Sequence, residues 1–276
     1  MVHATDMEIA VQSQDRGQVS RSAADVYHEF FVPALFGQWA GPVCDAARIV
    51  PGENILDVAC GTGVVTVEAE RRVGPTGKVT GLDINPGMLD AARRKSSAII
   101  WREANVQDIP FPDGSFDAVT CQFGLMFFDD RAAALAEMWR VLAPNGRLAL
   151  AIWDKLENTP GYAAVVELLE RLFEPAIATG MRAPFVLGDV KELTAIFAAA
   201  GVPNPRVETL DGTARFSSIE AWVHTDIKGW TLADLIDDDQ YATLLKQARQ
   251  DLARFCLDDG SVAFASPAHI VAAVKA

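Results

Sequence analysis

Short apolar runs alternate with longer amphipathic segments between residues 49 and 153. The runs are rich in branched aliphatic residues, and the segments between them carry apolar positions three or four apart, which predicts strands alternating with helices. This alternation is typical of a parallel sheet with right-handed crossovers. The predicted strands cover residues 54–59, 78–83, 99–105, 116–122 and 146–153. The predicted helices cover residues 64–72, 86–95 and 131–142.

The alternation breaks after Asp154. Residues 162–173 and 189–200 have helical spacing, residues 206–216 predict a sixth strand, and part of the tail (262–264 and 269–274) a seventh. A further helical stretch covers residues 217–255. The sequence therefore predicts an α/β fold, with a Rossmann-like, seven-stranded, mostly parallel sheet flanked by helices. We expect a helical cap formed by insertions at about residues 155–187 and 217–260.

Composition limits the classes of partner. The 276 residues carry a formal net charge of −13, which opposes binding to a nucleic-acid backbone, since that relies on clustered Lys and Arg. The four cysteines are far apart and predict neither a zinc site nor a disulfide framework. The first twenty residues are polar, and no stretch is long and apolar enough to span a bilayer. These features predict a soluble, cytoplasmic protein with a small-molecule partner and no membrane insertion.

A glycine-containing turn lies between the first predicted strand and the first predicted helix. In Cys60-Gly61-Thr62-Gly63, the glycines allow positive φ angles, and the free N–H groups at a helix start favour a polar or anionic ligand. A dinucleotide motif requires a third glycine where Thr66 stands, and no Gly-Lys-Ser/Thr follows to make a phosphate-binding Walker loop. The turn therefore predicts a small-molecule site of another kind.

Two acidic residues close the first two strands. Asp83 ends the second strand, where a carboxylate is well placed to accept hydrogen bonds from a ribose diol. Asp57 stands before the glycine turn, and we expect it to contact the ammonium group of a ligand directly or through water.

Four segments together resemble the class I S-adenosylmethionine-dependent methyltransferases, in particular the ubiquinone/menaquinone biosynthesis branch. Residues 57–63 resemble the family's acidic residue followed by G-x-G-x-G, with Ala59 in place of the first glycine. Residues 81–89 resemble its ribose-binding motif, residues 108–117 its third-to-fourth strand connection, and residues 137–148 the helix and turn before its fifth strand. These motifs occur in the family's order over about a hundred residues. Four motifs in order are a much more specific signal than a lone G-x-G.

The resemblance implies S-adenosylmethionine as the cofactor, S-adenosylhomocysteine as the product, and no metal. It also implies that residues 1–45 form an N-terminal helical lid before a core at 46–276; a helix packed on the sheet is the alternative. Asn105 would reach the adenine amino group, and Ile84 and Met88 would pack against the ring. The predicted cofactor-binding residues are Asp57, Ala59, Cys60, Gly61, Thr62, Gly63, Asp83, Ile84, Met88, Asn105, Val106 and Gln122.

The acceptor is expected to be a small, apolar or aromatic metabolite, because aromatic residues follow the fourth and fifth strands and recur in the lid. The predicted acceptor-site residues are Tyr27, Phe31, Trp39, Phe123, Phe127 and Trp153. The Asn/Asp-Pro-Pro-Tyr/Phe motif of enzymes that methylate nucleobase amines or protein glutamine is absent after the fourth strand. We expect O-methylation first, without excluding C- or N-methylation. His28 and His224 are weak candidates for a general base, and an ordinary surface role is the alternative for each.

Two other functions remain open at this point. A nicotinamide-dependent oxidoreductase requires the glycine that Thr66 replaces, and a non-catalytic S-adenosylmethionine-binding protein would share the same motifs. The sequence is compatible with a monomer or a homodimer.

Overall fold

The computed structural model describes residues 27–228, 232 and 235–276. Its centre is a seven-stranded sheet in the order β3-β2-β1-β4-β5-β9-β6. The strands, in chain order, are β1 (Asn54–Val58), β2 (Lys78–Asp83), β3 (Ile100–Glu103), β4 (Phe116–Gln122), β5 (Leu142–Trp153), β6 (Arg206–Leu210) and β9 (Ala268–Val274). Only β9 runs antiparallel to its neighbours, β5 and β6. The predicted Rossmann-like, mostly parallel sheet is confirmed.

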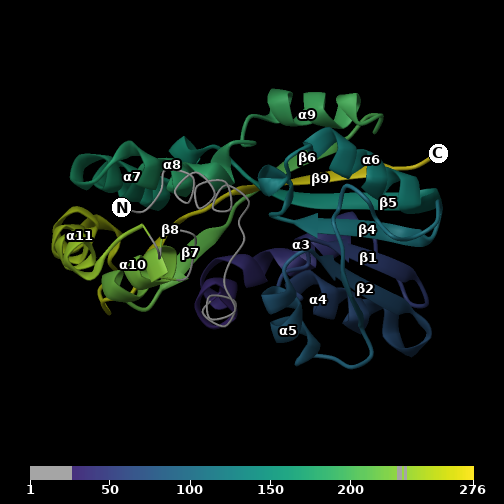
Figure 1. The fold of residues 1–276 in the computed structure, drawn as a ribbon, viewed down its shortest axis with the longest axis horizontal. Helices are drawn as coiled ribbons and strands as arrows, with labels where there is room; N and C mark the ends of the chain where they lie inside the picture. Colours follow the sequence, from purple (N-terminus) through teal and green to yellow (C-terminus); the bar gives the residue numbers. More distant parts are fainter. Residues whose placement is uncertain (1–26, 229–231, 233–234) are drawn as a thin grey trace, which may run out of the picture.

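Helices cover both faces of this sheet (Figure 1). One face carries α3 (Ala40–Ala46), α4 (Val64–Val73) and α5 (Pro86–Arg93), and the other carries α6 (Arg131–Val141) and α9 (Val190–Ala199). The residues of the inner strands β1, β2, β4, β5 and β9 are mostly buried, as expected for a sheet covered on both sides, whereas the edge strands β3 and β6 are largely exposed. The polar ligand-binding groups can therefore gather only where the strands end.

Side-chain caps define where several helices begin. Asn85 caps α5, because its side chain accepts hydrogen bonds from the backbone N–H groups of Gly87 and Met88 at the start of this helix. Asp189 caps α9 in the same way, through Lys191 and Glu192. These caps satisfy N–H groups that have no partner within the helix. The cap of α5 also fixes the backbone that follows Asp83.

The remaining helices form a cap beside the sheet (Figure 1). Within the first predicted insertion lie α7 (Pro160–Leu172) and α8 (Pro175–Arg182), and within the second lie α10 (Ile219–Lys228) and α11 (Asp238–Asp251). The cap also contains a two-stranded sheet, β7 (Thr213–Phe216) with β8 (Val262–Ala265). The single sixth strand predicted over residues 206–216 is therefore wrong: it is two strands, β6 in the main sheet and β7 in the cap.

Close packing around Gly212 explains why the chain forms two strands here. Gly212 separates β6 from β7, and a Cβ atom placed on it would lie 2.3 Å from the Trp39 ring and 2.4 Å from the Ser266 carbonyl oxygen. Ser266 donates its backbone N–H to the Gly212 carbonyl, so the connection from β6 to β7 and the connection from β8 to β9 meet at this point. Only glycine leaves room there for the Trp39 indole.

The described part of the predicted lid begins at Tyr27; residues 1–26 lie outside the described residues. It consists of the π-helix η1 (Tyr27–Phe36), a 3₁₀ turn at Gly37–Trp39, and then α3. The Gln38 side chain ties this segment to the cap, because its Oε1 accepts from the Thr213 N–H and its Nε2 donates to the Thr213 carbonyl. Within the described residues, no helix has the length and apolar character needed to cross a membrane.

Candidate active site

The glycine turn lies at the carboxyl end of β1. Three residues there have positive φ angles, Ala59 (51°), Gly61 (54°) and Gly63 (84°), and the Gly63 N–H closes the turn on the Cys60 carbonyl at 2.8 Å. The Gly61 N–H points the other way and donates to Asp83 Oδ2, also at 2.8 Å. The turn at β1 is thus fastened to the acidic residue at the end of β2.

Gly63 is required for packing as well as for its backbone angle. A Cβ atom on it would lie 2.5 Å from the end of the Trp101 ring, and the same ring covers Gly81 on β2. The two glycines let the Trp101 indole lie flat behind the turn, where its Nε1–H donates to the Ser96 carbonyl. Gly63, the second glycine of the motif, therefore leaves room for the ring that supports the turn. It does not line the cavity.

Replacing Gly63 with alanine should destabilise the protein more than a positive φ angle alone explains. We expect a loss of about 3 kcal/mol in the free energy of unfolding, measured with urea, from the left-handed backbone plus the clash. Gly260→Ala is the matched control, because its φ is 83° and nothing lies within 4 Å of its added Cβ; it should lose only about 1 kcal/mol. In a Trp101→Ala background, Gly63→Ala should cost no more than this control. Equal losses for the two glycines in the parent protein would refute the packing role.

Asp57 lies behind the glycine turn and does not face the cavity. Its side chain is buried, and its two oxygens accept hydrogen bonds from Thr66 Oγ1 at 2.6 Å and Thr120 Oγ1 at 2.8 Å. Burial raises the pKa of Asp57 to about 7, against the lowering effect of the two hydroxyls. The expected contact with a ligand ammonium group is therefore not supported. Asp57 instead joins the first turn of α4 to β4, because a buried carboxylate needs such donors.

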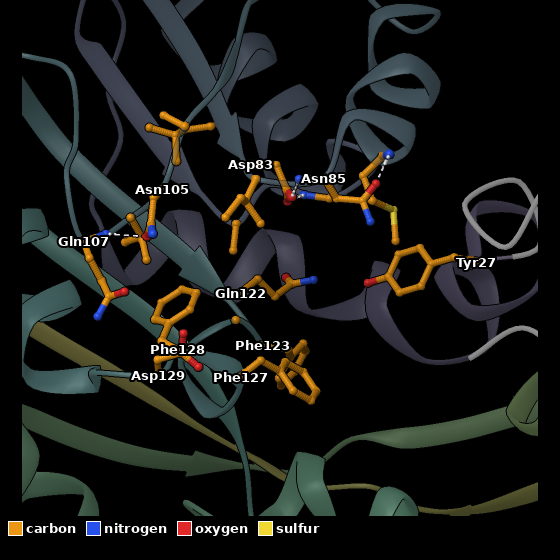
Figure 2. A pocket seen from close by; sticks show the side chains of 18 of the residues that line it. Tyr27, Asp83, Asn85, Asn105, Gln107, Gln122, Phe123, Phe127, Phe128 and Asp129 are labelled. Carbon is orange, nitrogen blue, oxygen red and sulfur yellow. Dashed lines mark hydrogen bonds between the residues drawn. The ribbon is translucent and has the colours of Figure 1, made fainter. Parts of the chain in front are cut away.

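Asp83 stands at the edge of the cavity (Figure 2). Its Oδ2 accepts from Gly61 and its Oδ1 accepts from the Asn85 N–H at 2.8 Å. Burial raises the pKa of this carboxyl group, while its backbone hydrogen bonds act in the opposite direction. A carboxylate can accept about four hydrogen bonds, so the backbone donors Gly61, Asn85 and Ile84 leave it able to accept from a ligand hydroxyl. The carboxylate is thus held rigidly with acceptor capacity to spare.

The loop after β3 forms another end of the same cavity. Asn105, Val106 and Gln107 line it, and Ile84 reaches over it with 49% of its surface exposed. The Asn105 Oδ1 accepts from the Gln107 N–H at 2.9 Å, which fixes the direction of the amide. An exposed apolar side chain beside a fixed amide suits a flat polar ring.

Aromatic side chains line the opposite end. Phe123 and Trp153 stack with ring centroids 3.7 Å apart and an interplanar angle of 6°, and Phe36 of the lid packs on both rings. Phe123 holds a φ of 54°, a strained angle for a bulky residue, and such strain is concentrated at functional sites.

Gln122 and Tyr27 lie between the polar and aromatic ends. The Gln122 Nε2 donates to the Phe36 carbonyl at 3.2 Å, and its buried Oε1 has no partner among the described residues. Figure 2 shows the Tyr27 hydroxyl pointing toward this amide. Burial and the nearby Asp83 raise the pKa of the Tyr27 phenol, so it stays neutral and can donate a hydrogen bond.

The structure brings most of the predicted site residues to this one cavity. The predicted cofactor residues that line it are Ala59, Gly61, Asp83, Ile84, Met88, Asn105, Val106 and Gln122. The predicted acceptor residues that line it are Tyr27, Phe123, Phe127 and Trp153.

The other predicted site residues lie elsewhere. Asp57 lies behind the glycine turn, Cys60, Thr62 and Gly63 belong to the turn but do not line the cavity, and Phe31 and Trp39 are buried in the packing of the lid. The weak general-base candidates do not reach the cavity either. His28 is exposed on the outer side of the lid, and His224 on α10 packs edge-on against Phe30. The described cavity lining contains no histidine.

Sequence reasoning missed several lining residues. Phe36, Asn85, Gln107, Phe128 and Asp129 all contact the cavity. Phe36 follows other aromatic residues of the lid and Phe128 follows Phe127, which is a signal for both, whereas Asn85 before Pro86 indicates only a helix start. Nothing in the local pattern marks Gln107 or Asp129. Across the described residues, no group of three His, Cys, Asp or Glu side chains is arranged to hold a metal ion.

Residues 56–150 match a family described as a methyltransferase domain. This segment of the chain is similar to methyltransferase domains. The match covers the glycine turn, Asp83, the loop after β3 and β4 in one continuous segment. The match agrees with the predicted family over this segment.

Curated relatives and solved structures agree with this assignment. The chain is 35% identical over 140 residues to the ubiquinone/menaquinone biosynthesis C-methyltransferase of Saccharophagus degradans, covering 49% of this chain and 56% of that protein. It is 49% identical over 124 residues to the demethylmenaquinone methyltransferase of Deinococcus radiodurans, covering 44% and 49%. The fold resembles phosphoethanolamine N-methyltransferase 2 of Haemonchus contortus with bound S-adenosylmethionine, at a TM-score of 0.60 and 16% identity, covering 95% of this chain and 58% of that one. The chain thus spans about half the length of the two curated relatives.

Proposed function

We propose that this protein transfers the methyl group of S-adenosylmethionine to a small, largely apolar acceptor with a flat ring, leaving S-adenosylhomocysteine. The observation that carries the proposal is the composition of a single cavity. Its polar end holds Asp83 and Asn105, and its aromatic end holds Phe123 and Trp153. A cofactor with a polar nucleoside and an apolar, ring-shaped acceptor fit these two ends.

The nucleoside is proposed to lie along the ends of β2 and β3. Asp83 accepts hydrogen bonds from the ribose hydroxyls, and the Asn105 side chain faces the exocyclic amine of adenine. Ile84 and Met88 cover the ring. Gln122 takes the part first expected of Asp57, because its buried Oε1 offers an acceptor to the amino group of the methionine moiety.

Methyl transfer then requires mainly positioning. The acceptor nucleophile attacks the methyl carbon as the carbon–sulfur bond breaks, and an already activated methyl group needs alignment and exclusion of water. Phe36, Phe123 and Trp153 supply flat apolar walls for this. The neutral Tyr27 hydroxyl can orient a polar group of either reactant.

The acceptor itself is proposed to carry an acidic hydroxyl on the ring. A phenol or enol ionises readily, which matches a described lining without histidine, lysine or arginine. Its anion is nucleophilic at oxygen and at the neighbouring carbon. The sequence favours oxygen as the methylated atom. One curated relative is a C-methyltransferase by name, so we propose carbon with equal weight. The net charge of −13 supports a small-molecule acceptor over nucleic acid. The cytoplasmic location and the monomeric or homodimeric state remain predictions.

Calorimetry with S-adenosylmethionine, S-adenosylhomocysteine and NAD tests the cofactor. We expect both sulfur nucleotides to bind and NAD not to bind. Mass spectrometry of a panel of phenols, quinols and enolic keto acids, incubated with protein and cofactor, then tests transfer; an added methyl that resists ether cleavage is on carbon. Binding of NAD alone would overturn the proposal, and cofactor binding without transfer to any ring would leave a binding protein.

A further inference from the structure

The loop that carries the adenine end of the cavity is fixed at both of its ends. At the first end, the Ala104 N–H donates to the Asp83 carbonyl at 3.1 Å, directly after β3. The lining residues Asn105 and Gln107 follow, joined by their own hydrogen bond. At the second end, two residues further along, Ile109 is buried with 2% of its surface exposed. The position of the adenine-facing amide therefore depends on how Ile109 is held.

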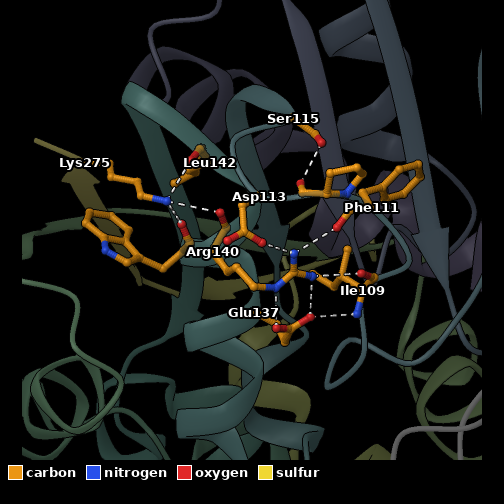
Figure 3. A network of polar contacts seen from close by, with 10 residues as sticks. Ile109, Phe111, Asp113, Ser115, Glu137, Arg140, Leu142 and Lys275 are labelled. Carbon is orange, nitrogen blue, oxygen red and sulfur yellow. Dashed lines mark hydrogen bonds and ion pairs between the residues drawn. The ribbon is translucent and has the colours of Figure 1, made fainter.

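Two side chains of α6 hold Ile109 (Figure 3), and we call Glu137 and Arg140 the helix clasp. Glu137 Oε2 accepts from the Ile109 N–H at 3.0 Å, and Arg140 Nη2 donates to the Ile109 carbonyl at 2.9 Å. Both polar groups of one buried loop residue are thus satisfied by one helix. Arg140 Nη1 continues along the loop, donating to the Phe111 carbonyl at 2.9 Å and to Asp113 at 2.7 Å.

The clasp is itself rigid. Arg140 donates to both carboxylate oxygens of Glu137, at 2.6 and 2.7 Å, one turn away on the same helix. This pairing lowers the pKa of Glu137, so the pair stays charged at neutral pH. Lys275 fixes the end of α6, because its Nζ donates to the carbonyls of Trp139 and Leu142 at 2.6 and 2.7 Å. Paired, bidentate charges on an anchored helix are suited to setting the position of a loop.

We propose that the helix clasp positions the adenine-recognition loop and thereby sets the selectivity of the protein for the nucleobase. This inference rests on the proposed function, because it takes the cavity end at Asn105 to be the adenine site. Neither clasp residue lines the cavity, so they act through the loop. Without the clasp, the buried Ile109 backbone groups would lose charged partners, and the loop would shift to find others.

Selectivity provides a readout that general instability does not change. S-Inosylhomocysteine differs from S-adenosylhomocysteine in carrying an oxygen where adenine has its amine, so the parent protein should bind it more weakly. In Arg140→Gln and Glu137→Gln, we expect S-adenosylhomocysteine to bind about tenfold more weakly and the ratio of the two dissociation constants to fall toward one. A ratio of affinities is independent of the fraction of protein that is folded.

The matched control is Arg249→Gln, which removes an exposed Arg–Glu pair between α11 and α10 at a similar distance, 2.8 Å to Glu220. It should leave both affinities unchanged. Amide hydrogen exchange should quicken over residues 105–113 in the clasp variants and nowhere else. Glu137→Gln keeps an oxygen near the Ile109 N–H but loses the charge that aligns Arg140, so it tests the clasp where Arg140→Gln is too unstable to measure.

The outcomes separate this inference from the proposed function. If the parent protein binds no S-adenosylhomocysteine, the proposed function is wrong. If the parent binds and discriminates, but the clasp variants keep its affinity and its ratio, the clasp only supports the fold and the inference is overturned.

Discussion

Replacing Asp83 with alanine is expected to weaken S-adenosylmethionine binding by at least about a hundredfold. The substitution removes two kinds of interaction at once. It deletes the proposed acceptors of the ribose hydroxyls, and it frees the N–H groups of Gly61 and Asn85, which both donate to this carboxylate at 2.8 Å. The glycine turn and the start of α5 then lose their common anchor. Calorimetric titration of the purified variant measures the effect.

Two further variants divide this loss into parts. Asp83→Asn keeps an oxygen for one backbone N–H and should bind with intermediate affinity. Asp90→Ala removes a more exposed carboxylate from α5, the helix that follows Asp83; this carboxylate pairs with Arg93 at 2.9 Å, and its loss should leave binding unchanged. Circular dichroism and the urea midpoint confirm that each variant is folded. Parent-like affinity in folded Asp83→Ala would show that the ribose lies elsewhere.

The core could be predicted from the sequence because its information is local. A buried parallel strand appears as a short apolar run, and Asn85 before Pro86 and Gly87 specifies a helix start within a few residues. Residues at the ends of such strands must meet at one edge of the sheet. For this reason Gly61, Asp83, Asn105 and Gln122, which follow different strands, line one cavity.

The direction in which a side chain points could not be predicted in the same way. Asp57 stands at a strand end, as Asp83 does, yet Thr66 and Thr120 draw its carboxylate into the core. Neither threonine is near it in the sequence, and their hydroxyls meet it only after α4 and β4 have packed on β1.

The lid shows the same limit. Its aromatic residues follow each other closely, but Phe31 and Trp39 are buried in packing while Tyr27 and Phe36 face the cavity. Tyr27, Phe31 and Phe36 lie in a π-helix, whose wider turn changes which residues share a face, and Trp39 lies in the 3₁₀ turn that follows. A pattern interpreted with ordinary helical spacing assigns them wrongly. The aromatic pattern indicated that this segment lies near the cavity, but the backbone conformation determines which of its residues line the cavity.

Asp226 in the cap gives the second large expected effect, a pH-dependent loss of stability. Its side chain is buried on α10 beside Trp222; Oδ1 accepts from the Tyr162 hydroxyl at 3.4 Å, and Oδ2 has no partner among the described residues. Burial raises the pKa of Asp226 to about 8. An unfolded aspartate ionises near pH 4, so between about pH 4 and pH 8 the unfolded state releases a proton that the folded state keeps. Stability is therefore lost as pH rises through this window.

Asp226→Asn should remove that loss while keeping an oxygen for Tyr162. We expect the variant and the parent to have similar free energies of unfolding near pH 4, and the variant to gain about 1.4 kcal/mol relative to the parent for each pH unit above that, up to about pH 8. Urea unfolding at several pH values measures the difference. The buried Asp57, with its pKa raised to about 7, contributes equally to both proteins and cancels. Parallel stability curves across this range would mean that Asp226 is ionised and compensated in the folded cap, and that its burial does not govern the pH response.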